Sequence, residues 1–297
     1  MKKTLAILLA LVLTLVPVFA YADGEVSVVE TTVASTSREG VEIPTFFTLP
    51  ADVESADSLV VLIHGHHGNH NEWGGYDAVS NALAASGIVA ATLDFSGCGA
   101  SAEDYQNNAM SYMCADVADV INAAKELYGV EKVGAMGYSM GGRIVCQMLI
   151  EDLASFDTIV FVAPAVSLND LIAMFGGQEN YDNMKAEIAG TDNMYPFPGA
   201  FGEQLLSNKF FEDLEKYGED MAELAAAKFE GNTLTIYSTN DSIVSPSVSQ
   251  ACADAFGATV ITNSVLDHSY SFYGTDPATV AALNTAISTF FISELAA

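Results

Sequence analysis

Ser139 is the residue whose surroundings indicate chemistry most clearly. The segment Gly137-Tyr138-Ser139-Met140-Gly141 has the pattern G-x-S-x-G and lies between a short apolar run and an apolar helical pattern. A strand that turns directly into a helix holds its serine in a strained conformation, and glycines beside it let backbone approach closely. We therefore predict that Ser139 is a nucleophile, with the Met140 N–H at a helix start favouring negative charge. The alternative is an ordinary glycine-rich turn.

A nucleophilic serine needs a base to take its proton, so the histidines decide whether the hypothesis holds. The chain has five histidines: four lie close together between positions 64 and 70, and His268 stands alone near the C-terminus. Where a strand–serine–helix turn carries the nucleophile, the chain order runs nucleophile, acid, histidine, and only His268 lies downstream of Ser139. We predict that His268 is the base. The alternative is a structural histidine.

The carboxylate that orients His268 is expected after the preceding buried strand. The turn Ser238-Thr239-Asn240-Asp241-Ser242 follows such a strand, and Asp241 is its only acid. Its predicted role is to hold one imidazole tautomer and to stabilise the imidazolium, without itself taking the proton. Asp267 is the competing acid, but adjacent side chains in an extended loop generally diverge.

Acyl transfer also needs N–H donors aimed at the oxyanion of the tetrahedral intermediate. We expect one donor from Met140 and a second from His66, which lies in the H-G-x-x-G segment of residues 64–68. The rival interpretation is metal ligation by the four clustered histidines, but their close spacing on a tight turn does not guarantee that their lone pairs converge. We expect no metal, and this chemistry requires no cofactor.

Alternating strand and helix patterns surround these residues and predict an α/β fold with a mostly parallel sheet. Residues 25–35 and 41–49 read as an antiparallel opening hairpin. Apolar runs typical of strands covered on both faces follow at residues 59–63, 88–93, 133–136, 158–163 and 234–237, and residues 258–262 are expected to form the last strand. Helical periodicity spans residues 107–128 and returns from Pro277 to the C-terminus. We expect helices on both faces of the sheet.

One interval, from about 167 to about 228, interrupts this alternation. It contains no clear buried strand, its middle carries Tyr195-Pro196-Phe197-Pro198, and its end looks helical. A long insertion at the catalytic edge of a sheet is usually a functional cap. The alternative is a surface insertion without a role. We predict one domain over residues 23–297 that carries this cap.

The N-terminus predicts export. Lys2 and Lys3 precede an apolar stretch over residues 5–16, and Ala20-Tyr21-Ala22 resembles a cleavage site, so residues 1–22 are predicted to be a signal peptide. The apolar stretch is shorter than the roughly 20 residues that span a bilayer, which argues against the alternative of a retained anchor. We expect a secreted or periplasmic protein without stable membrane insertion after cleavage.

Charge and cysteine content argue against several classes of binding partner and metal site. The formal net charge of −28 is unfavourable for binding nucleic acid or anionic membranes. There is no D-x-D-x-D-G calcium loop, and the four cysteines include no C-x-x-C pair that would indicate zinc. Export permits disulfides, but the apolar helical patterns around Cys114 and Cys146 favour free, buried thiols.

Together these segments resemble the α/β-hydrolase superfamily across nearly all of residues 23–297. The matching segments are His64-Gly65, residues 93–101, residues 137–141, residues 241–246 and Asp267-His268. Within the superfamily the chain is most similar to bacterial cinnamoyl (feruloyl) esterases and related acyl hydrolases. The sequence departs from many relatives at Cys98, where they carry a histidine, and its cap matches no relative residue by residue.

The resemblance implies a Ser139–His268–Asp241 triad and an insertion that caps an acyl pocket. It implies a secreted serine carboxylic-ester hydrolase that acts on small-molecule esters, such as hydroxycinnamoyl esters linked to plant polysaccharides, or lipid esters. A lipase, a thioesterase or a peptidase on the same triad is the alternative. A non-catalytic binding protein of this fold is a further alternative, although all three triad positions are intact.

Overall fold

The computed structural model describes residues 26–51, 53, 55–199, 202–268 and 276–295. The predicted signal peptide, residues 1–22, lies outside the described residues, so export stays a prediction.

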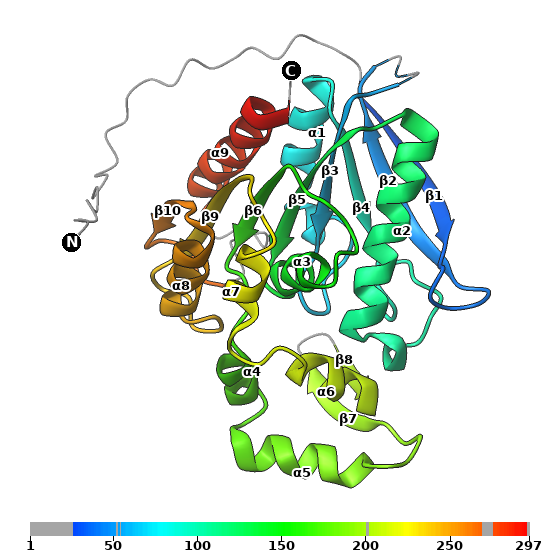
Figure 1. The fold of residues 1–297 in the computed structure, drawn as a ribbon, viewed down its shortest axis with the longest axis vertical. Helices are drawn as coiled ribbons and strands as arrows, with labels where there is room; N and C mark the ends of the chain where they lie inside the picture. Colours follow the sequence, from blue (N-terminus) through cyan, green and yellow to red (C-terminus); the bar gives the residue numbers. More distant parts are fainter. Residues whose placement is uncertain (1–25, 52, 54, 200–201, 269–275, 296–297) are drawn as a thin grey trace.

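An eight-stranded sheet forms the centre of the molecule, with strand order β1-β2-β4-β3-β5-β6-β9-β10 (Figure 1). Its strands are β1 Ser27–Ala34, β2 Glu42–Leu49, β3 Ser58–Ile63, β4 Val89–Leu93, β5 Lys132–Tyr138, β6 Thr158–Val162, β9 Asn232–Ser238 and β10 Thr259–Asn263. β2 pairs antiparallel with β1 and with β4, and the remaining pairs are parallel. The predicted hairpin and the predicted parallel strands are thus confirmed.

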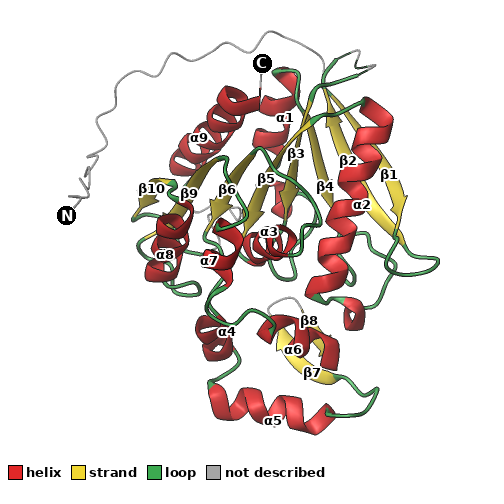
Figure 2. Ribbon diagram, in the orientation of Figure 1, coloured by secondary structure: helices red, strands yellow, loops and turns green. Residues whose placement is uncertain are grey.

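Helices cover both faces of the sheet, as Figure 2 shows. The larger helices around it are α1 Asp77–Ala85, α2 Met110–Tyr128, α3 Met140–Ile150, α8 Pro246–Phe256 and α9 Pro277–Leu295, with the short α7 Met221–Ala226 beside α3 and α8. Two 3₁₀ turns, η1 Glu72–Gly74 and η2 Tyr105–Asn107, lie in the loops after β3 and β4. This arrangement confirms the predicted fold class.

Side chains alternate between the two faces along each buried strand, because the side-chain period of a strand is two residues. In β3, Leu59 and Val61 join the apolar core under α2 and α3. Val60 and Leu62 join the core under α1 and α9. α9 is long and apolar enough to cross a bilayer, alone among helices of the described segments, but Leu283, Ile287 and Phe291 bury its inner face in this core.

The cap lies beyond the carboxyl edge of the sheet and has a small core of its own (Figure 1). It comprises α4 Leu168–Met174, α5 Gln178–Ile188, the hairpin β7 Tyr195–Gly199 with β8 Gly202–Leu206, and α6 Asn208–Glu215. Ser167 and Ser207 cap α4 and α6, each accepting a backbone N–H three residues on. α7, at the end of the interval, instead packs its Met221, Ala222 and Ala225 into the main core.

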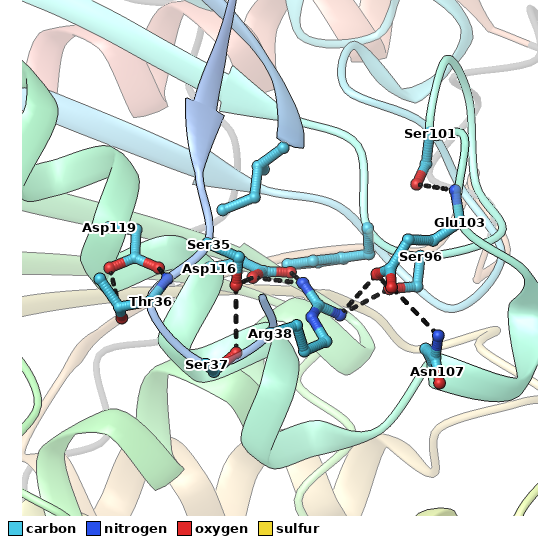
Figure 3. Close-up of polar contacts among 12 residues, drawn as sticks. Ser35, Thr36, Ser37, Arg38, Ser96, Ser101, Glu103, Asn107, Asp116 and Asp119 are labelled. Carbon is cyan, nitrogen blue, oxygen red and sulfur yellow. Dashed lines mark hydrogen bonds and ion pairs between the residues drawn. The ribbon is translucent and has the colours of Figure 1, made fainter. Parts of the chain in front are cut away.

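A buried polar network fastens the β1–β2 turn to the body (Figure 3). Arg38 donates to both carboxylate oxygens of Asp116 on α2, at 2.6 and 2.7 Å. Its other terminal nitrogen contacts Glu103 Oε2 at 2.9 Å. Nearby, Asp119 accepts the backbone N–H and the hydroxyl of Thr36, both at 2.8 Å. The guanidinium and the Asp116 carboxylate are both buried, so each needs the opposite charge of the other to offset the loss of hydration.

Arg38→Met is expected to destabilise the protein by about 3–5 kcal/mol, because it leaves the Asp116 carboxylate buried without its cation. Urea denaturation followed by circular dichroism measures this change. Lys125→Met on the exposed side of α2 is the control, and its free energy of unfolding should change by less than about 0.5 kcal/mol. Equal midpoints for Arg38→Met and the control would contradict the structural role of the network.

Candidate active site

Ser139 lies at the tight turn between β5 and α3, as the sequence predicts. Its φ of 52° places it in the left-handed region, which is unfavourable for a residue with a side chain. The strain is held by backbone bonds from Ser139 N to Val162 O, at 2.9 Å, and from Ala165 N to Ser139 O, at 3.0 Å. Such over-determined strain is typical of functional sites. The turn fixes the Ser139 hydroxyl at the carboxyl edge of the sheet.

The glycines beside Ser139 are required by close packing of backbone. A Cβ on Gly137 would lie 2.6 Å from the backbone of Gly141 and Gly142. A Cβ on Gly141 would lie 2.2 Å from Ile63 O. Any side chain at either position would therefore push α3 away from the strands that carry it. This is the close approach that the G-x-S-x-G pattern predicts.

The structure brings Ser139, His268 and Asp241 together from three separate loops. Ser139 Oγ lies 2.9 Å from His268 Nε2. His268 Nδ1 lies 2.8 Å from Asp241 Oδ2. A carboxylate can only accept, so Nδ1 carries the proton and Nε2 is free to accept from the serine hydroxyl. Of the two acids considered from the sequence, Asp241 makes this contact.

Asp241 is fixed on its other side as well. Its Oδ1 accepts the backbone N–H groups of Ile243 and Val244, both at 2.9 Å. Its side chain is only 1% exposed. The His268 backbone is held in turn by the Tyr138 hydroxyl, which donates to His268 O at 2.7 Å. The imidazole is therefore clamped in the orientation that faces Ser139.

The four clustered histidines make separate hydrogen bonds rather than facing one common point. His64 is fully buried, its Nε2 accepts the Phe95 N–H at 3.3 Å, and burial lowers its pKa to about 4, so it is neutral and structural. His70 Nδ1 contacts the carboxylate of Asp94 at 3.1 Å. Among the residues that the structure describes, no group of three or more His, Cys, Asp or Glu side chains is arranged to hold a metal.

His66 and His67 face the cap instead. Gln204 Oε1 on β8 lies 2.9 Å from His66 Nε2, and Gln204 Nε2 lies 2.8 Å from His67 Nδ1. An amide oxygen only accepts and an amide nitrogen only donates, so His66 carries its proton on Nε2 and His67 Nδ1 is an acceptor. Burial lowers the pKa of both imidazoles, which favours these neutral forms. The cap and the loop of residues 64–68 are thereby joined.

A cavity of about 300 Å³ lies between Ser139 and the cap. His66 and Met140, whose backbone N–H groups are the predicted oxyanion donors, both line this cavity. Met140 is the first residue of α3, so its N–H has no partner within the helix. The remaining lining is mainly apolar and aromatic, and includes Met110, Leu171, Phe175, Phe197 and Phe210. The cavity can hold an apolar acyl group above the serine hydroxyl.

Comparisons with known proteins agree with this fold. The profile of the serine aminopeptidase S33 family matches residues 54–186. A structure described as ferulic acid bound to Est1E from Butyrivibrio proteoclasticus superposes with a TM-score of 0.73 over 90% of this chain and 100% of that chain, at 18% identity. A putative hydrolase from Agrobacterium vitis S4 superposes with a TM-score of 0.67 over 89% and 98% of the chains, also at 18% identity.

The chain has the α/β-hydrolase fold. This confirms the fold that the sequence resemblance implies. The fold is also shared with Pyrococcus horikoshii acylaminoacyl peptidase, which superposes with a TM-score of 0.65 at 13% identity and covers 91% of this chain and 42% of that chain.

Arg143 on α3 connects the helix that follows Ser139 to the cap. Arg143 is 1% exposed, and its guanidinium donates to Val166 O at 3.1 Å and to Leu214 O, near the end of α6, at 2.5 Å. No carboxylate in the described segments forms an ion pair with it, in contrast to Arg38. The free carbonyl groups at the C-terminus of a helix carry partial negative charge and attract cations. Arg143 therefore stabilises the docking of α6.

Arg143→Met is expected to destabilise the protein by about 2–4 kcal/mol, because two buried carbonyls lose their donor. The midpoint of urea denaturation measures the change. Arg143→Lys keeps the charge but lacks the planar fork, and we expect it to recover only part of the loss. A Met variant with the wild-type midpoint would show that the cap docks without this contact.

Sequence reasoning missed three residues that shape the site: Gln204, Glu72 and Tyr138. Gln204 joins the cap to His66 and His67, and the Tyr138 ring lies 2.9 Å from where a Cβ on Gly65 would be. Glu72 is a buried carboxyl group that accepts the Gly65 N–H at 2.5 Å. No motif marks Gln204 or Glu72. Tyr138 stands inside the G-x-S-x-G segment, where the pattern leaves its identity open.

All four cysteines are buried free thiols. Cys98, the position that departs from many relatives, accepts a weak bond from the Asn108 amide at 3.7 Å. Burial raises the pKa of its thiol to about 12. Cys98 is therefore a packing residue behind the site.

Proposed function

We propose that the protein is a serine carboxylic-ester hydrolase with Ser139 as nucleophile, His268 as base and Asp241 as the orienting acid. The observation that carries the proposal is the unbroken contact from Ser139 Oγ through the His268 imidazole to Asp241. The arrangement matches the three roles that nucleophilic catalysis by serine requires.

Each step of the proposed hydrolysis is assigned to a group of this site. The Ser139 hydroxyl attacks the ester carbonyl and its proton passes to His268 Nε2, while the N–H groups of Met140 and His66 stabilise the oxyanion. Collapse expels the alcohol, which takes the proton from Nε2, and leaves an acyl ester on Ser139. Water then attacks the acyl group, gives a proton to Nε2 and releases the acid as Ser139 regains its hydrogen.

The cavity supports an aromatic acyl group as substrate. Rings of Phe175, Phe197 and Phe210 line the side contributed by the cap, and they suit a planar apolar group such as hydroxycinnamoyl. The similarity to Est1E, whose structure contains ferulic acid, supports the same choice. The ester is thus proposed to be a small molecule or a hydroxycinnamoyl group linked to a polysaccharide.

A peptidase on the same triad is the second candidate, because the matching family profile is that of serine aminopeptidases. Hydrolysis of methyl ferulate, p-nitrophenyl butyrate and an aminoacyl p-nitroanilide by the purified protein separates the two. We expect both esters to be cleaved and methyl ferulate to have the lower KM. Cleavage of the anilide alone would replace the esterase proposal with the peptidase.

Export through a signal peptide at residues 1–22 completes the proposal. The basic and apolar pattern of these residues supports it. Sequencing of the N-terminus of the protein recovered outside the cytoplasm is expected to begin at Asp23. A mature protein that retains Met1 in the membrane fraction would contradict it.

A further inference from the structure

Glu72 is a carboxyl group buried directly behind the loop of residues 64–68. Glu72 lies in the η1 turn after β3 and is only 1% exposed. Glu72 and Trp73 have φ values of 47° and 56°, so two consecutive residues with side chains adopt left-handed backbone. Strain of this kind persists only where surrounding structure imposes it, and it clusters at functional sites.

The contacts of Glu72 are with the backbone of the 64–68 loop. Oε1 accepts the Gly65 N–H at 2.5 Å. A Cβ on Gly68 would lie 2.5 Å from the same oxygen, and the Gly68 N–H closes the loop by donating to Gly65 O at 3.1 Å. The loop therefore needs glycine at position 68 because the carboxyl group occupies the space beside it. Gly65 immediately precedes His66, whose N–H is the proposed second oxyanion donor.

The electrostatic surroundings of Glu72 do not explain its burial. No Lys, Arg or His of the described chain forms an ion pair with it. The titratable groups around it include the Tyr76, Cys98 and Tyr138 side chains, none of which carries a compensating positive charge. Burial raises the Glu72 pKa to about 7. The hydrogen bond that the buried Glu72 side chain makes within the described residues goes to the Gly65 N–H, which indicates that its role lies in that bond.

We infer that Glu72 is a positioning residue that fixes the Gly65–His66 segment so that the His66 N–H faces the oxyanion. This inference rests on the proposed function, because it assigns a role within the same reaction. The Gly65 N–H is held on the Glu72 side of the loop, and the following residue, His66, lines the cavity with Ser139. Glu72 itself touches no reacting atom.

Glu72→Leu tests the inference, because it keeps an apolar side chain in the buried site and removes the acceptor. We expect kcat for methyl ferulate to fall by about 10- to 100-fold with KM changed by less than about threefold, since only the transition state uses the hole. Glu72→Gln keeps an oxygen acceptor for Gly65 N–H and is expected to recover most of kcat. Asp119→Asn, at a buried carboxylate that also accepts a backbone N–H, is the matched control and should leave kcat unchanged.

If Glu72→Leu does not fold, Gly68→Ala provides a second test of the inference. The added methyl group would displace the carboxyl oxygen, so kcat should fall in the folded variant. In a Glu72→Ala background the same methyl group has room, and the two losses should be clearly less than multiplicative. Wild-type kcat in folded Gly68→Ala, or full multiplicativity, would overturn the inference.

Thermal denaturation gives a readout that is independent of catalysis. The pKa of Glu72 is raised from 4.5 to about 7 in the folded protein, so the unfolded chain ionises first as pH rises, and stability falls across this interval. Glu72→Gln cannot ionise. We expect it to gain in Tm relative to the wild type as the pH rises from about 5 to about 8. An identical pH dependence of Tm in both proteins would contradict the buried carboxyl group described above.

The outcomes separate this inference from the proposed function. If the wild type cleaves none of the esters and Ser139 does not react with an active-site probe, the proposed function fails. If the wild type is active and Glu72→Leu is folded with kcat within about threefold of it, the positioning role alone fails.

Discussion

Ser139→Ala is expected to lower kcat for ester hydrolysis by a factor on the order of 10⁴ to 10⁶. Alanine removes the atom that forms the acyl-enzyme while preserving the packing of the turn. The N–H groups of the oxyanion hole and the apolar cavity remain, so KM should change little. Steady-state kinetics with methyl ferulate, using freshly purified protein to exclude wild-type contamination, measures the loss.

The control for Ser139→Ala is Ser80→Ala, at a buried serine in α1 outside the site. It should retain wild-type kcat. Because both variants lose one hydroxyl from a buried position, their melting temperatures should be similar, which separates lost chemistry from lost folding. A Ser139→Ala enzyme with more than about a tenth of wild-type kcat would show that another group attacks the ester.

Asp241→Asn is expected to reduce kcat by about 10⁴-fold while leaving the fold intact. The asparagine oxygen can still accept the N–H groups of Ile243 and Val244. Its amide nitrogen, however, would donate toward His268 Nδ1 and favour the tautomer that carries its proton on Nε2. That tautomer cannot accept the proton of Ser139.

Asp157→Asn provides the comparison for Asp241→Asn, because Asp157 is a carboxylate that also accepts a backbone N–H, from Val133 at 2.8 Å, at the opposite end of the sheet. Its kcat should match the wild type. Kinetics for both variants between about pH 6 and 9, with circular dichroism at each pH, measure the difference. A loss of less than about tenfold in Asp241→Asn would move the orienting role to another acid, with Asp267 tested next.

Most of the sheet could be predicted from the sequence because its signals are local. A strand buried on both faces is a continuous apolar run, and the run before Ser139 must end where the glycines allow a sharp turn. The same logic placed His268 and Asp241 after consecutive strands, and the carboxyl ends of parallel strands meet at one edge. The order of the strands along the chain was therefore enough to predict that Ser139, Asp241 and His268 lie at one edge of the sheet.

The cap hairpin could not be predicted because its sequence lacks strand signals. β7 contains Pro196 and Pro198, which cannot donate to a ladder, and both are exposed while Phe197 turns toward the cap core. Proline is tolerated in strands only at such edges. The hairpin is specified by packing of Phe197 against Phe175 rather than by local preference.

Glu72 and Gln204 escaped prediction for a different reason. Both are polar residues in segments that read as surface loops, and only long-range packing buries them. The left-handed conformation of Glu72 leaves no mark in a sequence, since neither Glu72 nor Trp73 is a residue type that favours it. Their bonds to Gly65, His66 and His67 are properties of the folded chain alone.

Labelling with a fluorophosphonate probe tests the central claim most directly, because the probe reacts with a serine only where a base and an oxyanion hole activate it. After digestion, mass spectrometry should find one adduct on the peptide that contains Ser139. The adduct should be absent from His268→Ala and from heat-denatured protein. A folded wild-type protein that is not labelled, or is labelled at a different serine, would contradict the account.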